Sequence, residues 1–189
     1  MKRREFFALP AAAALLAFGG CTTTGSRRGD PATRRRDIDS GVEGTLQRLY
    51  ETVPGSREMA GRAKGILVFP EVIAAGFIVG GEYGEGALRV GDRTQAYYST
   101  VTGSLGFQAG AQSKAVVFMF MTDEALQQFS RSNGWTAGAD ASVAVAKVGA
   151  NGVIDTNTAR GPVVGFVMTN AGLMANLNLE GTKVTRLDL

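Results

Sequence analysis

Apolar side chains recur at helical spacing near the start of the predicted folded region. Ser40 and Glu43 fit a capping box, in which two side chains bond to free backbone N–H groups at a helix start. The positions that follow form one apolar stripe: Val42, Leu46, Leu49, Tyr50 and Val53. Pro54-Gly55 ends this helix, and Ser56 predicts the cap of a second, short helix that runs to about Ala63. We therefore expect two helices ahead of the first strand.

From Ile66 onward the pattern changes to short β-type runs that glycine interrupts. The runs that predict strands are Ile66–Phe69, Val72–Val79, Gly86–Val90, Gln95–Val101, Ser104–Ala109, Lys114–Met121, Ala141–Val148, Val153–Thr156, Pro162–Thr169, Leu173–Leu179 and Lys183–Leu187. One helix interrupts them at Asp123–Arg131, with Thr122 as its cap and Asn133-Gly134 as its end. Asn151-Gly152 predicts a hairpin turn.

The predicted strands are of two kinds, and the difference constrains the architecture. Val116–Met121 and Val163–Met168 are apolar on both faces, whereas Leu173–Glu180 alternates and leaves one face to solvent. Strands of the first kind need cover on both sides. The predicted helices are too few to cover such a sheet twice, so the sheet must fold on itself. We expect an α+β, β-dominated fold: a curved antiparallel sheet in a barrel-like or sandwich core, with N-terminal helices and one inserted helix.

The densest glycine cluster spans residues 76–86. A phosphate-binding loop is one reading, but the cluster has neither a P-loop pattern nor a G-x-G-x-x-G run that leads into a helix. Bulges and sharp bends in a curved sheet explain it better. The glycines between residues 103 and 110 are interpreted in the same way.

The N-terminus has the features of an export signal. Residues 2–4 are basic, the next uncharged stretch runs from Phe6 to Gly20, and small residues precede Cys21. Arg3 and Arg4 resemble a twin-arginine signal, and residues 16–21 resemble a bacterial lipobox with Cys21 as the acylated residue. We therefore predict a signal peptide over 1–20, a flexible arginine-containing tether over 21–40, and a folded domain over 41–189. The tether arginines either contact anionic headgroups or keep a spacer soluble.

Composition excludes several classes of chemistry. The chain has no histidine, and Cys21 is its one cysteine, so His-dependent triads, His/Cys metal sites and internal disulfides are absent. From residue 41 onward there are 12 basic and 13 acidic residues, which does not support a nucleic-acid partner. We expect no cofactor and no metal. An acid/base pair among the carboxylates has no spacing rule behind it, and caps, turns and solvated faces account for them: Glu82, Glu85, Asp123, Asp140 and Asp155.

Two groups of side chains are candidates for contact with lipid. Arg57, Arg62 and Lys64 cluster around the predicted short helix, either as a headgroup-binding patch or as a solvated helix face. An apolar, methionine-rich set is expected in the core, with the wall of an acyl-chain cavity as the alternative. This set comprises Phe118, Met119, Phe120, Met121, Phe166 and Met168.

Five segments follow one another in an order known from one protein family. They are Ala63–Pro70, Gly76–Gly86, Ser104–Ser113, Phe120–Leu126 and Gly172–Lys183. Over about residues 41–189 the chain resembles the SYLF domain family. The resemblance implies a lipid-binding module; eukaryotic relatives bind phosphoinositides and some associate with actin, whereas bacterial members are often secreted or lipid-anchored. It supplies no catalytic residue.

These observations together predict a lipoprotein rather than an enzyme. We expect Cys21 to anchor the chain in the bacterial cell envelope, facing the periplasm, with a SYLF-like domain that binds phospholipid. Thr22, in place of the aspartate typical of inner-membrane retention, favours the outer membrane. Actin is not an expected partner of an exported protein. The alternative is a structural or protein-interaction module of the envelope, whose only membrane contact is the acyl anchor; a carboxylate-dependent hydrolase is a third possibility.

Overall fold

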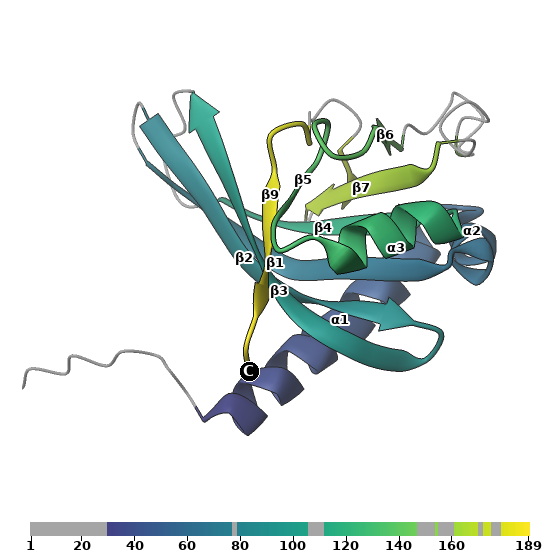
Figure 1. The fold of residues 1–189 in the computed structure, drawn as a ribbon, viewed down its shortest axis with the longest axis horizontal. Coiled ribbons are helices and arrows are strands. Elements are labelled where there is room, and N and C mark those ends of the chain that lie inside the picture. The colour runs from purple at the N-terminus through teal and green to yellow at the C-terminus, as the bar shows by residue number, and fades with distance from the viewer. Residues whose placement is uncertain are drawn as a thin grey trace, which may run out of the picture.

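The structure, a computed structural model, describes residues 30–76, 79–105, 112–146, 154, 161–169, 172–174 and 179–189. Figure 1 labels its elements in chain order. The helices are α1 (Pro31–Thr52), α2 (Ser56–Arg62) and α3 (Asp123–Arg131). The strands are β1 (Gly65–Gly76), β2 (Val79–Val90), β3 (Arg93–Leu105), β4 (Gln112–Phe120), β5 (Trp135–Thr136), β6 (Val143–Val145), β7 (Val163–Thr169), β8 (Gly172–Leu173) and β9 (Lys183–Leu187).

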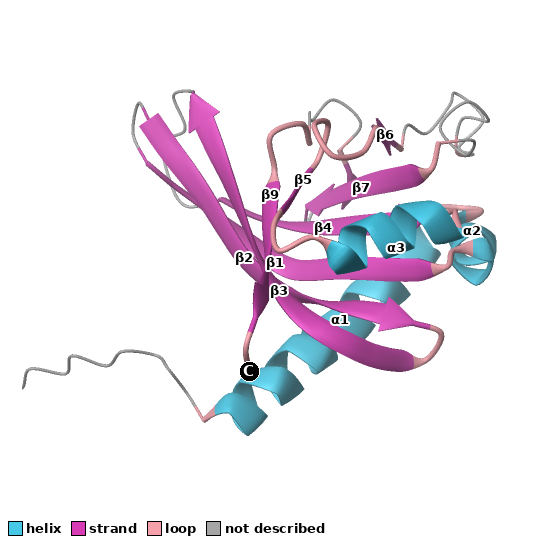
Figure 2. Cartoon of the chain, viewed as in Figure 1, coloured by secondary structure: helices cyan, strands magenta, loops and turns pink. Residues whose placement is uncertain are grey.

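One strongly curved sheet organises the described chain. Its strand order is β5-β9-β3-β2-β1-β4-β7-β6, and β8 pairs with β7. The ladders are antiparallel except for that between β6 and β7. The long strands bend, and α1 lies across one face while α3 covers the other (Figure 2). The predicted α+β, β-dominated fold is confirmed in its curved-sheet form.

The sheet has a packed core on each face. The α1 face buries Val42 and Leu49 of the helix against alternate strand residues such as Val117 and Phe166. The α3 face buries Phe129 and Trp135, whose rings lie 5.5 Å apart by centroid, edge to face. Five members of the methionine-rich set are almost fully buried, which confirms core packing: Phe118, Met119, Phe120, Phe166 and Met168. Met121 is partly buried against the α1-face core.

A bulge at Pro70 joins two predicted strands into β1. Between Val68 and Glu71, β1 advances three residues while β2 advances two, so one extra residue is accommodated there. The same shift appears against β4. Proline has no backbone N–H to give to a ladder, so a central strand tolerates it only at such an irregularity. The prediction of a break at this proline was therefore wrong, although the irregularity itself is there.

The glycines of β2 allow a close approach between neighbouring strands. A Cβ at Gly86 would lie 2.0 Å from the carbonyl oxygen of Val68, and one at Gly84 would lie 2.6 Å from that of Glu71. Both carbonyls flank the β1 bulge. This confirms the interpretation of the cluster as a feature of sheet curvature.

The first helix starts ten residues earlier than expected, which shortens the predicted tether. Residues 31–40 are helical, and Asp30 is the cap: its carboxylate accepts from the backbone N–H of Thr33 at 3.2 Å. Pro31 stands at the first helical position, where its missing N–H costs nothing. The predicted capping box at Ser40 is therefore wrong, because that residue lies inside α1.

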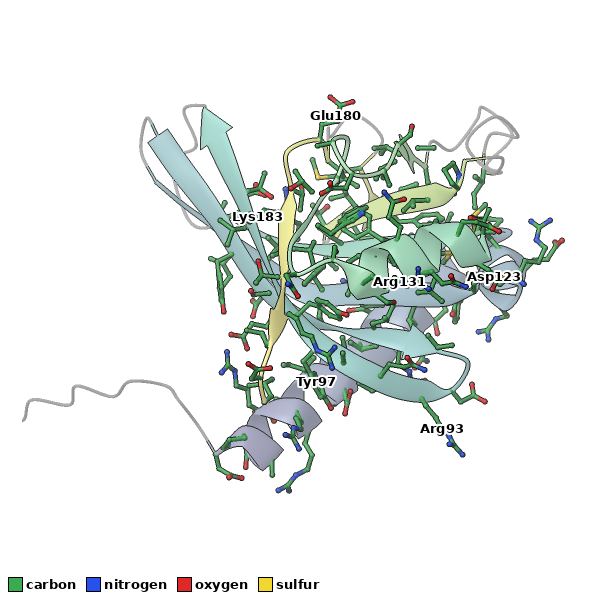
Figure 3. All side chains as sticks on the ribbon, in the orientation of Figure 1. Arg93, Tyr97, Asp123, Arg131, Glu180 and Lys183 are labelled. Carbon is green, nitrogen blue, oxygen red and sulfur yellow. The ribbon has the colours of Figure 1, made fainter. Side chains whose placement is uncertain are left out.

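Contacts far along the chain hold these first turns in place. The Arg34 guanidinium makes a two-point ion pair with the Glu85 carboxylate of β2, with 2.7 Å between Nε and Oε2. This pairing lowers the pKa of Glu85 and raises that of Arg34. Asp39 accepts from the hydroxyls of Thr94 and Tyr97, each at 2.8 Å; Figure 3 shows Tyr97 beside α1. The arginine-rich composition of this segment predicts a tether and gives no sign of these contacts with β2 and β3.

The remaining elements follow the sequence more closely. α3 and β9 coincide with their predicted ranges, and the Thr122 hydroxyl accepts from Ala125 N–H, as a cap does. Gly55 rather than Ser56 caps α2, with φ of 84°, and the Ser56 hydroxyl donates to the Leu49 carbonyl instead. Predictions that fall on residues 1–29, including Arg3, Arg4 and Cys21, lie outside the described residues. So does the hairpin at 151–152, and so does the strand at 153–156 except for Ile154.

Candidate functional site

The three predicted headgroup residues are all exposed but differ in their contacts. Arg57 and Arg62 are exposed on α2. Lys64 follows α2, and its ammonium lies 3.3 Å from the carboxylate of Asp123 at the start of α3, which is labelled in Figure 3. The ion pair engages the charge of Lys64, so this residue is a poorer ligand for an anion than the two arginines.

Arg57 is held over an aromatic ring while its N–H groups stay available. Its guanidinium carbon lies 4.5 Å from the centroid of Tyr50 on α1, a cation–π contact. Within the described part of the chain Arg57 makes no hydrogen bond and no ion pair. Burial raises the pKa of the Tyr50 phenol, and the positive charge of Arg57 opposes this rise. Arg57 is thus an oriented cation with free donors.

A hollow of about 410 Å³ opens beside this pair, which we call the α2 hollow. It lies between α1, α2 and the turn from β2 to β3. Its lining comprises Glu43, Leu46, Tyr50, Arg57, Ala60, Gly61, Ala63, Gly65, Ile66, Arg89, Gly91 and Asp92. Neither Arg62 nor Lys64 is among these residues. Arg57 therefore lines the hollow itself, whereas Arg62 and Lys64 are next to residues that line it.

Arg89 is a second cation of the α2 hollow that the sequence analysis missed. One of its terminal nitrogens lies 3.2 Å from the Glu43 carboxylate, and the other donates to the Asp92 carbonyl at 3.2 Å. Its side chain is 18% exposed and that of Glu43 70% exposed, so the arginine is fixed and its partner faces water. Arg89 is 32 residues from Arg57, and no local pattern links the two. The site can bind an anion by charge-assisted hydrogen bonds from Arg57, whereas the charge of Arg89 is paired with Glu43, as that of Lys64 is paired with Asp123.

Four of the five candidate carboxylates have structural partners. Glu82 pairs with Lys114, Glu85 with Arg34, and Asp123 with Lys64. Asp140 accepts from the backbone N–H of Thr136 at 2.6 Å. Asp155 lies outside the described residues. In the described ranges no three acidic, histidine or cysteine side chains gather in a way that could hold a metal ion.

Comparisons with known proteins match the C-terminal part of the chain to a family. Residues 101–188 match the profile of the Ysc84 family, described as Las17-binding protein actin regulator. This is the family of the SYLF domain, and these residues belong to it. An SH3 domain-containing protein of Schizosaccharomyces pombe is 31% identical over 140 residues, which cover 70% of this chain and 32% of the yeast protein. The chain thus spans about a third of the length of that relative.

Proposed function

We propose that this chain is an exported lipoprotein, anchored through Cys21, whose SYLF domain binds phospholipid headgroups at the α2 hollow. The observation that carries the proposal is Arg57, a solvent-exposed cation with free donors beside a hollow of about 410 Å³ that a second arginine also lines. No described helix has the length and the apolar character needed to cross a bilayer. The signal-like residues 1–21 supply the proposed anchor.

The chemistry of the hollow matches a phosphate-bearing headgroup. Guanidinium groups form short, strong hydrogen bonds with phosphate oxygens, and the described residues engage none of the N–H groups of Arg57. Apolar side chains such as Leu46 and Ile66 also line the hollow and can contact the glycerol part of a lipid. The domain from residue 41 is close to neutral, so we expect weak intrinsic binding. An acyl anchor compensates for this because it raises the effective lipid concentration.

The proposed location is the bacterial cell envelope, on the periplasmic side and at the outer membrane. Export signal, lipobox and Thr22 support it. Actin regulation, which the family description mentions, is not carried over, because an exported protein would not meet actin. We propose a binding protein rather than an enzyme, since the described candidate carboxylates are engaged in structural contacts.

Co-sedimentation with vesicles tests the proposal. The chain from residue 22 onward is mixed with vesicles of phosphatidylcholine, with or without phosphatidylglycerol, at two salt concentrations. We expect binding to the anionic vesicles that weakens with salt. Arg57→Gln should reduce it about fivefold, the effect of roughly 1 kcal/mol per cation at a membrane surface.

Arg62→Gln is the matched control, because it removes the same charge from the same helix outside the α2 hollow. Equal losses in both variants would reject the α2 hollow as the site. If the chain ignores both kinds of vesicle, the anchor supplies all membrane contact, and the envelope interaction module becomes the better explanation.

A further inference from the structure

A second concave surface runs along the other flank of α1. One hollow of about 370 Å³ is lined by Asp37, Ile38, Gly41, Pro70, Glu71, Ile73, Tyr83, Gly84 and Glu85. Another of about 220 Å³ is lined by Arg48, Pro70, Glu71, Ser113, Lys114, Ala115, Met168 and Thr169. The two share Pro70 and Glu71, so they adjoin. We call the pair the α1 groove.

The α1 groove and the α2 hollow use different sides of the helix. At 100° per residue, Asp37, Gly41 and Arg48 fall on one flank of α1, whereas Glu43 and Tyr50 fall on the other. The two sites can therefore be changed independently.

One end of the α1 groove is apolar and open to solvent. Ile73 of β1 is 45% exposed and Tyr83 of β2 is 49% exposed, and the two face each other across the ladder. Pro70 and Ile38 continue this surface toward α1. The Tyr83 hydroxyl donates to Glu85 at 2.6 Å, so its ring lies fixed along the groove wall. An acyl chain laid across these side chains would remove their apolar surface from water.

The other end holds a cation without a partner. The Nε of Arg48 is shielded from solvent and has no hydrogen-bond partner, and across the described residues Arg48 forms no ion pair. Arg48 also lines the smaller hollow, and its terminal N–H groups make no hydrogen bond to the described residues, so they can donate to an anion there. Lys114 does not compete for that anion, because its ammonium lies 2.8 Å from the Glu82 carboxylate.

Glu71 lies where the two hollows meet. It is exposed, and its carboxylate accepts from the Ser113 hydroxyl at 3.3 Å. The polar part of the groove therefore presents an arginine and a carboxylate, of opposite charge. This combination matches a headgroup with a phosphate and an ammonium group better than a purely anionic one.

We propose that the α1 groove binds one single-chain phospholipid with a phosphoethanolamine head. The acyl chain lies against Ile73 and Tyr83, the phosphate accepts from Arg48, and the ammonium faces Glu71. The smaller hollow alone is below the lower limit of small-ligand pockets, about 300 Å³, and the two together fall well within that range. Lipid binding is thereby extended from a surface contact to a single molecule held in an open groove.

Calorimetric titration of the chain from residue 22 onward tests this assignment, because the contacts described here all lie within residues 30–189. The probe is lysophosphatidylethanolamine below its micelle concentration. We expect Arg48→Gln to weaken binding about tenfold, the value of one charge-assisted hydrogen bond. The urea midpoint of this variant should not fall, since no partner is lost. Glycerophosphoethanolamine, which has no acyl chain, should not bind detectably.

Two matched variants separate the apolar end from general surface hydrophobicity. Ile73→Ser should weaken binding several-fold, whereas Met174→Ser, at an exposed apolar residue outside both hollows, should not. Equal affinity of wild type and Arg48→Gln, equal loss in the two serine variants, or no binding by wild type would overturn the proposal. Tighter binding of lysophosphatidylglycerol would overturn the role of Glu71.

The outcomes distinguish this inference from the proposed surface site. Arg57→Gln should leave the affinity for the monomeric probe unchanged, and Arg48→Gln should leave vesicle sedimentation unchanged. A chain that ignores vesicles but binds the probe would refute the α2 hollow and retain the α1 groove.

Discussion

Lys114 and Glu82 form a nearly buried ion pair, and removing one partner should be costly. The ammonium of Lys114 on β4 lies 2.8 Å from the carboxylate of Glu82 on β2, across β1. The side chains are 15% and 10% exposed, so water screens the pair little. Breaking a buried pair typically costs 3–5 kcal/mol, because the remaining charge stays without compensation. With the residual exposure, we expect about 3 kcal/mol for Lys114→Met, at the lower end of that range.

Removing both charges should cost far less than removing one. In the double variant Lys114→Met with Glu82→Met no isolated charge is left, and buried pairs replaced by apolar residues are often neutral in stability. We expect the double variant to lie within about 1 kcal/mol of wild type, which corresponds to a coupling of roughly 2 kcal/mol or more.

Urea denaturation followed by circular dichroism measures these differences. The single variant should also melt roughly 6–12 °C below wild type, given about 2–4 °C per kcal/mol for a domain of this size. If the double variant were as unstable as the single one, the loss would come from packing rather than from the isolated charge. A single variant as stable as wild type would show that water reaches Glu82.

Two further predictions concern the curvature of the sheet and the attachment of α1. Gly86→Ala should cost about 3 kcal/mol in urea denaturation, because its Cβ would meet the Val68 carbonyl, while Gly81→Ala, with open space around it, should cost much less. Arg34→Met should cost about 1 kcal/mol at neutral pH. Since the folded-state pKa of Glu85 is lowered, this stabilisation is present above the ordinary carboxyl pKa and disappears as the pH falls through the folded value. Wild type and Arg34→Met should therefore converge in stability in acid; a constant difference would contradict the ion pair.

The elements that local chemistry determines were predictable from the sequence. α3 has its Thr122 cap and acidic first turn within a few residues of each other, and its predicted range is correct. A continuous apolar run predicts the buried strand β7. Local rules failed at Pro70. Its sequence context predicts the end of a strand, but the ladders with β2 and β4 accommodate a bulge there and β1 continues.

The error at the start of α1 and the omission of Arg89 have one cause: partners distant in the sequence. Residues 31–40 have little apolar periodicity, and Arg34 and Asp39 find their partners on β2 and β3 only after the sheet has formed. Arg89 joins Arg57 in the same way. The clustered charge that suggests Arg57 is shared with Arg62, and only the fold shows that Arg57 lines the hollow. The missing partner of Arg48 is visible only when its burial is known.

The attachment of α1 has a mechanical consequence for an anchored protein. A pull at Asp30 along the axis of α1 would act on a helix that is fastened sideways to the sheet at Arg34 and Asp39. Such a load shears these contacts together instead of peeling them one by one. If the proposed anchor holds the protein at a membrane, these contacts would resist such a load before it reached the concave surfaces on the two flanks of α1.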